Sequence, residues 1–269
     1  MKIAREYYGL ALFTALIIFF GFVPYSWSRI NSLEYNADNI PVVVMLLYFC
    51  GPAMAAFISA ALIDDDRGIL ELFSGLAVVK LKPKWYLLAF LIPFAGMYLS
   101  LKISPEFTKY VPVFEDRGIF KPAFLLMIPF FAFAEEIGWR AYALTDLLHK
   151  NSPVVSGIVS GIIWSLFYLP TALGTDFVFK GFPFWIIMLS LIGLSVIMTW
   201  IYINTRHSLL LMVLMRTIIY AFPVFFPFLA LQSQSQAPYA LWAEINIIII
   251  IFVLIFDKKM WKPSIIPAK

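Results

Sequence analysis

Charged side chains, cysteine and histidine are all scarce in this sequence. Only 13% of its 269 residues are charged, about half the share that is usual in soluble domains, so a soluble globular protein is excluded. The one cysteine, Cys50, excludes an internal disulfide framework and any cysteine-based metal cluster. The two histidines, His149 and His207, stand at the ends of apolar segments, where we interpret them as surface residues.

Apolar residues make up the bulk of the chain: 62% are hydrophobic, 18% are aromatic and the mean hydropathy is +0.88. Segments long enough to cross about 30 Å of hydrocarbon occur at 8–27, 40–63, 85–102, 121–146, 153–174, 183–205, 208–231 and 239–256. We therefore predict an all-α fold, a polytopic membrane helical bundle with about eight transmembrane helices. No polar or Pro/Gly/Ser-rich linker divides the chain, so residues 1–269 are expected to form a single domain.

Lysine and arginine are unevenly shared between the two sets of loops. If the N-terminus is cytoplasmic, twelve cationic residues fall on the cytoplasmic side: Lys2, Arg5, Arg67, Lys80, Lys82, Lys84, Lys150, Arg206, Lys258, Lys259, Lys262 and Lys269. Six fall on the other side: Arg29, Lys102, Lys109, Arg117, Lys121 and Lys180. Because cytoplasmic loops carry an excess of Lys and Arg, we expect both termini to be cytoplasmic. We expect an integral protein of the cell membrane of a prokaryote.

Two local features interrupt the apolar segments. Residues 68–84 are apolar but short and have a basic end, which is typical of a helix lying at the membrane surface; a tight re-entrant turn is the alternative. The Cys-Gly-Pro run at 50–52 is expected to kink the second segment, and Pro223 and Pro227 are expected to bend or break the seventh.

The most informative stretch is FAFAEEIGWR at 131–140, where Glu135, Glu136 and Arg140 stand inside an apolar segment. An ionisable group at bilayer depth costs at least about 2.5–3.5 kcal/mol on insertion scales and marks a functional site by default. We expect these groups to line a polar, hydrated cavity between the fourth, fifth and seventh segments. This cavity is expected to open toward the cytoplasmic half.

The sequence indicates which charged side chains of this stretch can form ion pairs. On a helix, Glu136 and Arg140 are four residues apart and can form an ion pair, which either joins helices or belongs to a site. Glu135 has no local partner of opposite charge, so it is the stronger candidate for a general acid or base. Arg216 lies within the seventh segment and needs a counter-charge. We therefore predict that Arg216 faces Glu135.

At these positions the sequence resembles the CAAX prenyl protease and bacteriocin-processing (CPBP, formerly Abi) family of membrane endopeptidases. The first family motif, E-E-x-x-x-R, is matched by EEIGWR at 135–140. The pattern GIIW…LP at 161–170 resembles the second motif, and SLLL at 208–211 resembles the lead-in to the third. The resemblance implies a glutamate-dependent intramembrane peptidase. In such a site the first Glu activates water, a His from each of two later helices completes the site, and an Asn follows the second His by one turn.

This sequence departs from the family at the later positions. Tyr168 occupies the place of the first His, Arg216 that of the second His, and Tyr220 that of the Asn. A site of Glu and His needs groups that exchange protons near neutral pH, whereas arginine is effectively always protonated. Without the two imidazoles a zinc site loses its main ligands, so we predict no metal and no cofactor. The candidate catalytic residues are Glu135, Glu136, Arg140, Tyr168, Arg216 and Tyr220.

Two classes of function follow, and a third stays open. In the first, the chain is a catalytically degenerate family member that binds a peptide, a prenylated C-terminus or another membrane protein. In the second, it is a protease with altered machinery, in which Glu135 activates water and Tyr168, Tyr220 or Arg216 stabilises the oxyanion. The third is an unrelated transporter or channel, although the sequence shows no internal repeat of the kind that many transporters carry. The lipid bilayer is its expected surrounding, and no nucleic-acid partner is expected.

Overall fold

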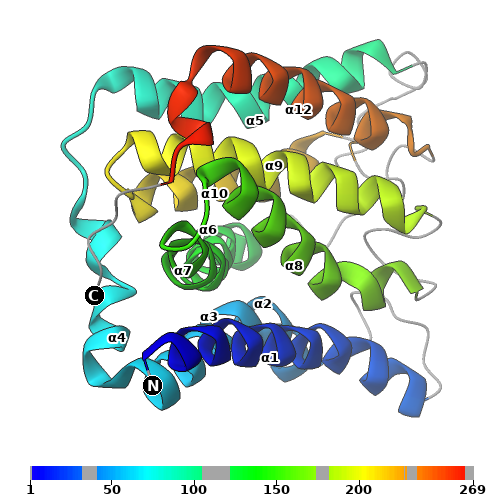
Figure 1. Ribbon diagram of the computed structural model, residues 1–269. Coiled ribbons are helices and arrows are strands. Elements are labelled where there is room, and N and C mark those ends of the chain that lie inside the picture. Colours follow the sequence, from blue (N-terminus) through cyan, green and yellow to red (C-terminus); the bar gives the residue numbers. More distant parts are fainter. Residues whose placement is uncertain are drawn as a thin grey trace.

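The computed structural model describes residues 2–31, 41–104, 122–173, 182–226, 228 and 235–263, and this part of the chain is a bundle of helices without strands (Figure 1). The main helices are α1 (Lys2–Ile30), α2 (Val42–Phe49), α3 (Gly51–Ser59), α5 (Pro83–Ile103), α6 (Pro122–Glu136), α8 (Pro153–Leu173), α9 (Phe184–Asn204), α10 (Leu209–Phe225) and α12 (Ala237–Phe256). Shorter helical segments are η1 (Ala60–Asp64), α4 (Asp65–Glu71), η2 (Ser74–Ala77), η5 (Ile137–Leu144), α7 (Thr145–Leu148) and η6 (Lys258–Trp261). Helices satisfy every backbone polar group within one segment, as hydrocarbon requires.

The prediction of a membrane helical bundle is confirmed, and within the described residues fewer than the eight expected spans meet a test of length and composition. Within the described residues, five helices are long and apolar enough to cross a membrane: Tyr8–Trp27, Pro83–Ile103, Pro153–Pro170, Phe184–Asn204 and Ala237–Phe256. A sixth is added if α2 and the helix that follows it are one bent span. The two remaining predicted segments are also helical. However, α10 has only 17 residues, and the segment from α6 to α7 contains the charged run at 135–140.

The second segment is bent where the sequence predicts a kink. Residues Val42–Phe49 and Gly51–Ile63 meet at 55°, with Cys50 between the two helices and Pro52 in the first turn of α3. Gly51 lies so close to α1 that a Cβ atom there would come within 2.7 Å of the Cβ of Phe20. The bend therefore depends on a proline that fits the start of a helix and on a glycine that admits a neighbouring side chain.

The seventh segment ends earlier than its predicted limit at residue 231. Phe226 has extended backbone angles, φ −130° and ψ 145°, as expected for a residue that precedes a proline in the sequence. The helix α10 therefore stops at Phe225, while Pro223 is accommodated inside it. Pro227 itself lies outside the described residues, as do the cationic residues Lys109, Arg117, Lys121, Lys180 and Lys269.

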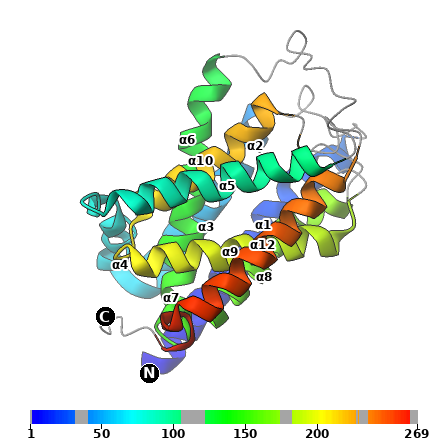
Figure 2. The ribbon, with the colours of Figure 1, turned by 90° about the horizontal axis from the view of Figure 1, so that it is seen from above.

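One helix takes a direction different from its neighbours. In Figure 1, α6 is seen nearly end-on, whereas α1, α5, α8, α9 and α12 run across the view. Figure 2, turned by 90°, shows α6 along its length, passing through the middle of the bundle toward α7. The segment α6–η5–α7 therefore brings its polar residues into the centre of the molecule, between helices on either side.

A cluster of polar contacts fixes the end of the bundle where α9, α12 and η6 meet. The carboxylate of Asp257 accepts hydrogen bonds from the indole Nε1 of Trp200 at 3.0 Å and from Nδ2 of Asn204 at 2.8 Å. The ammonium of Lys259 donates to Oδ1 of Asn204 at 3.0 Å. These contacts attach the segment after α12 to the end of α9.

The expected surface helix at 68–84 corresponds in part to a short apolar helix at Gly68–Ala77, formed by the end of α4 and by η2, and an irregular stretch follows it up to Lys82. This stretch is attached to the turn before α10. The guanidinium of Arg206 donates to the carbonyl oxygen of Lys80 at 2.8 Å, and the hydroxyl of Ser208 donates to that of Val78 at 2.7 Å. Gly75 permits the approach, because a Cβ atom there would lie 2.6 Å from the carbonyl oxygen of His207.

A buried cluster of charges

The two adjacent glutamates stand at the end of α6, where the α-helix changes into the wider π-helix η5. Gly138, in the first turn of η5, lies against α3: a Cβ atom there would come within 2.5 Å of the carbonyl oxygen of Pro52. The hydroxyl of Thr145 donates to the carbonyl oxygen of Arg140 at 2.9 Å at the other end of η5. π-Helical turns are rare in proteins, and those that occur often lie at functional sites.

The predicted contact between Arg216 and Glu135 is confirmed. Nη2 of Arg216 lies 2.9 Å from Oε2 of Glu135, although the sequence places them 81 positions apart. The same guanidinium also reaches Glu136, which the sequence analysis did not predict: its Nε donates a hydrogen bond to Oε1 of Glu136 at 3.1 Å. One arginine from α10 therefore bridges both glutamates of α6.

The second cation, Arg140, completes the cluster. Its Nε lies 3.4 Å from Oε2 of Glu136, as the spacing of four residues predicts, and its Nη2 lies 2.8 Å from the sulfur of Met198 on α9. Two carboxylates and two guanidinium groups thus stand together, so that the formal charges of the cluster cancel when all four are ionised. Matching of this kind is required, because a buried charge without a partner is strongly destabilising.

An aromatic ring of α8 supports both arginines. The guanidinium carbon of Arg216 lies 3.8 Å from the ring centroid of Trp164, and that of Arg140 lies 4.9 Å from it. A guanidinium within about 6 Å of an indole ring is attracted by its electron-rich face. Trp164 was seen in the sequence only as part of a motif, and its role as a shared cation–π partner was missed. Two arginines in an apolar bundle are a signal to look for such a ring. Met198 gave no signal in the sequence.

The two tyrosines that occupy the places of the family's first His and its Asn lie beside Glu135. The hydroxyl of Tyr220 donates a hydrogen bond to Oε1 of Glu135, and the hydroxyl of Tyr168 lies 3.4 Å from that of Tyr220. Oε1 of Glu135 is therefore in contact with a phenol and Oε2 with a guanidinium. The structure brings all six candidate residues into one cluster: Glu135, Glu136, Arg140, Tyr168, Arg216 and Tyr220.

The expected opening of this site toward one end of the bundle is not found. Glu135, Glu136 and Arg140 are 0% exposed and Arg216 is 2% exposed. The guanidinium of Arg216 lies against both glutamates, so a cation is their neighbour on this side. A general base needs a free lone pair directed at the group that it deprotonates, and both oxygens of Glu135 already have a partner.

The cluster is also a poor metal site. Within the described residues, no group of three or more His, Cys, Asp or Glu side chains stands where it could hold a metal ion. The two carboxylates face cationic groups, which repel a metal ion. His207 lies instead in the turn before α10, with its ring 4.9 Å from that of Tyr202, and both His207 and His149 are half-buried.

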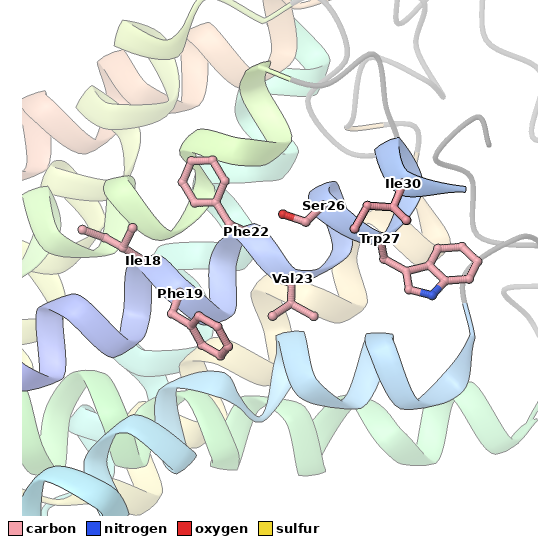
Figure 3. A pocket seen from close by; sticks show the side chains of 7 residues that line it. All are labelled: Ile18, Phe19, Phe22, Val23, Ser26, Trp27 and Ile30. Atoms are coloured by element: carbon pink, nitrogen blue, oxygen red, sulfur yellow. The ribbon is translucent and has the colours of Figure 1, made fainter. Parts of the chain in front are cut away.

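An apolar groove of about 410 Å³ occurs elsewhere, on the flank of α1. Figure 3 shows its seven lining side chains, all from α1 between Ile18 and Ile30, with Ser26 the only polar one among them. An apolar lining is what a surface in contact with lipid requires. None of the six clustered residues lines this groove.

Comparison with known proteins identifies similar sequences. Residues 118–222 match the family model described as type II CAAX prenyl endopeptidase Rce1-like, and all six clustered residues fall within that range. A protein named CAAX prenyl protease 2 from Methanococcus maripaludis is 27% identical over 198 residues, covering 68% of this chain. The matched region spans 66% of the length of that relative, just under two thirds.

Proposed function

Since the chain belongs to the CPBP family of membrane proteins, whose peptidases rely on a motif glutamate, we propose that it is a member in which an ion-pair cluster has replaced the hydrolytic centre. It is an integral membrane protein, and we propose that it acts as a binding or partner protein of a prokaryotic cell membrane, with both termini cytoplasmic. The observation that carries this proposal is the bridging of Glu135 and Glu136 by Arg216, at 2.9 and 3.1 Å.

The positions of the substituted residues support the proposal. Tyr168, Arg216 and Tyr220 match the places of the family's His, His and Asn, and they gather around Glu135 in space. A permanently cationic arginine cannot accept a proton from water or return one to a leaving group. Its guanidinium also holds the carboxylate of Glu135 by direct contact. Water activation at Glu135 would therefore require the guanidinium of Arg216 to move away from this carboxylate.

One observation favours the alternative of an active protease with altered machinery. The hydroxyl groups of Tyr220 and Tyr168 form a short chain that starts at Glu135. Hydroxyl donors beside a carboxylate can stabilise an oxyanion when a peptide bond is attacked. On that alternative, Glu135 activates water and the two phenols contact the developing negative charge.

A cleavage assay separates the two possibilities. The protein, reconstituted in phosphatidylcholine vesicles, is incubated with a farnesylated peptide that ends in a CAAX sequence and, separately, with a panel of unmodified peptides. We expect no cleavage above that of Glu135→Gln. If the wild-type protein cleaves a peptide and Glu135→Gln does not, the degenerate site is disproved and the alternative holds. Thermal unfolding of both proteins serves as the control for folding.

A further inference from the structure

A third acidic residue stands inside a membrane span, and the cluster does not include it. Glu244 is the eighth residue of α12 (Ala237–Phe256). At 1.5 Å per residue it lies about 10 Å from the start of that helix. Among the spans that length and composition identify in the described residues, the only acidic side chain is that of Glu244. Glu135 and Glu136 of the cluster are paired with arginines, whereas no described residue forms a hydrogen bond or an ion pair with Glu244.

Glu244 points away from the bundle. The opposite face of α12 is buried against its neighbours: a Cβ atom on Gly193 of α9 would lie 3.2 Å from the Cβ of Asn246, and one on Gly96 of α5 would lie 3.4 Å from Nε1 of Trp242. Glu244 is exposed, as are Ile248 and other apolar residues of the same face: Ile251, Phe252 and Ile255. Figure 1 shows α12 at the margin of the bundle, next to α5.

An exposed carboxyl group at this depth is costly in a bilayer. Ionisable residues within membrane spans almost always face the interior of a bundle or pair with another group. Glu244 does neither in the isolated chain. To reach the level of the N-terminal end of α12, the carboxyl group of Glu244 would have to extend about 10 Å along the helix. That distance is longer than a glutamate side chain. The apolar residues around Glu244 are favourable in contact with lipid, so the carboxyl group is the one unfavourable group on this face.

We propose that the outer face of α12 around Glu244 is the docking surface for a transmembrane helix of another protein, which presents a lysine or arginine at the depth of Glu244. The argument is charge complementarity: a cation is the group that satisfies a carboxylate in hydrocarbon, and the flanking isoleucines provide apolar contact. A second copy of this chain would place two glutamates opposite each other, and like charges repel. The surface is separate from the buried cluster, so this proposal does not depend on whether the chain cleaves peptides.

The test uses a defined probe, a fluorescent 20-residue peptide of leucine and alanine with one lysine at the eighth position. Its association with the protein in phosphatidylcholine vesicles is measured by energy transfer. We expect the lysine peptide to bind the wild-type protein about 5- to 30-fold more tightly than it binds Glu244→Leu, which is the gain of one interhelical polar contact. A peptide with leucine at the eighth position, or with lysine at the third, should not distinguish the two proteins.

Two further variants keep the test decisive. Ile248→Ala removes apolar contact from the same face and should retain the preference for lysine. Glu244→Gln keeps the shape of the side chain and should lose most of the preference for the lysine peptide. This variant therefore provides the same test if Glu244→Leu does not fold. Equal binding of the lysine peptide by the wild-type protein and both Glu244 variants would overturn the proposal. A wild-type dimer that Glu244→Leu dissociates would also overturn it, because the occupant would then be a second copy.

Discussion

Gly138 and Pro52 are in direct backbone contact across two helices, and a Cβ atom at residue 138 would lie 2.5 Å from the carbonyl oxygen of Pro52 and 2.6 Å from its carbonyl carbon. The close approach joins the bend between α2 and α3 to the π-helix that carries Arg140. The glycine therefore sets the distance between the bent span and the charged cluster.

Gly138→Ala is expected to destabilise the protein, because the added methyl group meets backbone atoms that cannot move aside. Overpacking of this kind costs about 1–3 kcal/mol, and the loss is measured as a lower temperature of unfolding in detergent. The matched control is Gly96→Ala, whose Cβ atom would meet its nearest neighbour at 3.4 Å, an ordinary contact distance. Equal losses for both variants would contradict the close contact at residue 138.

Arg216→Ala is expected to cost about 3–5 kcal/mol, because it leaves two buried carboxylates without their shared cation. The double change Arg216→Ala with Glu135→Gln should be less destabilised, since it removes the carboxylate that loses its cation, while Glu136 keeps its contact with Arg140. Chemical unfolding of the three proteins measures the difference. Arg206→Ala, which removes an exposed contact to the carbonyl oxygen of Lys80, is the control and should cost less. A double variant that is less stable than Arg216→Ala would show that the ion pair of Arg216 with Glu135 is not what stabilises the cluster.

Stability is expected to depend on pH through Asp257, which follows the end of α12. Partial burial raises the pKa of Asp257, but hydrogen bonds from Asn204, the backbone amide of Lys259 and Trp200 outweigh it, so the pKa lies below its ordinary value. A depressed pKa contributes stability that is present above the unfolded value of about 3.9. That stability is lost as the pH falls through the lower folded value.

The measurement compares the unfolding free energy of the wild-type protein with that of Asp257→Asn between pH 7 and pH 2. The wild-type protein should have the larger unfolding free energy near pH 7. The difference between the unfolding free energies of the two proteins should decrease as the pH falls below about 4. A difference that stays constant over this range would mean that the hydrogen bonds to Asp257 act independently of its charge.

Restoring the family residues tests the proposed loss of the hydrolytic centre directly. Tyr168→His, Arg216→His and Tyr220→Asn together remove the bridging guanidinium and return groups that exchange protons near neutral pH. We expect this triple variant to cleave a farnesylated CAAX peptide at a rate about 10²- to 10⁴-fold above that of the same variant with Glu135→Gln, which is the usual gain from a general base. A folded triple variant without Glu135-dependent cleavage would show that the site lacks more than these three residues.

Much of the site can be read from the sequence, because charges in hydrocarbon must be matched. This requirement alone predicts that Arg216 faces Glu135, and the spacing of four residues predicts the contact between Glu136 and Arg140. The bridging of both glutamates by Arg216 depends on how α10 is turned relative to α6, which no local pattern records. The four charged side chains are buried rather than open to one end of the bundle, which no local pattern records either.

The fold shows a similar division between local and distant causes. The bend at Cys50 and the early end of α10 before residue 227 follow from proline chemistry and were predicted. The π-helix after Glu136 was not, since its apolar residues have ordinary helical spacing, and the contact of its Gly138 with Pro52 joins helices that are distant in the sequence. Glu244 was overlooked although the signal was present: it is the one acid in an otherwise apolar segment.

The position of Cys50 makes the bend between α2 and α3 accessible to magnetic resonance. The chain has no second thiol, and this one lies half-buried between the two helices that meet at 55°. A nitroxide attached to Cys50 would therefore carry the whole spectral signal from the natural sequence. Its mobility and its contact with lipid-soluble or water-soluble relaxing agents would report whether that joint stays bent when the bundle meets a binding partner.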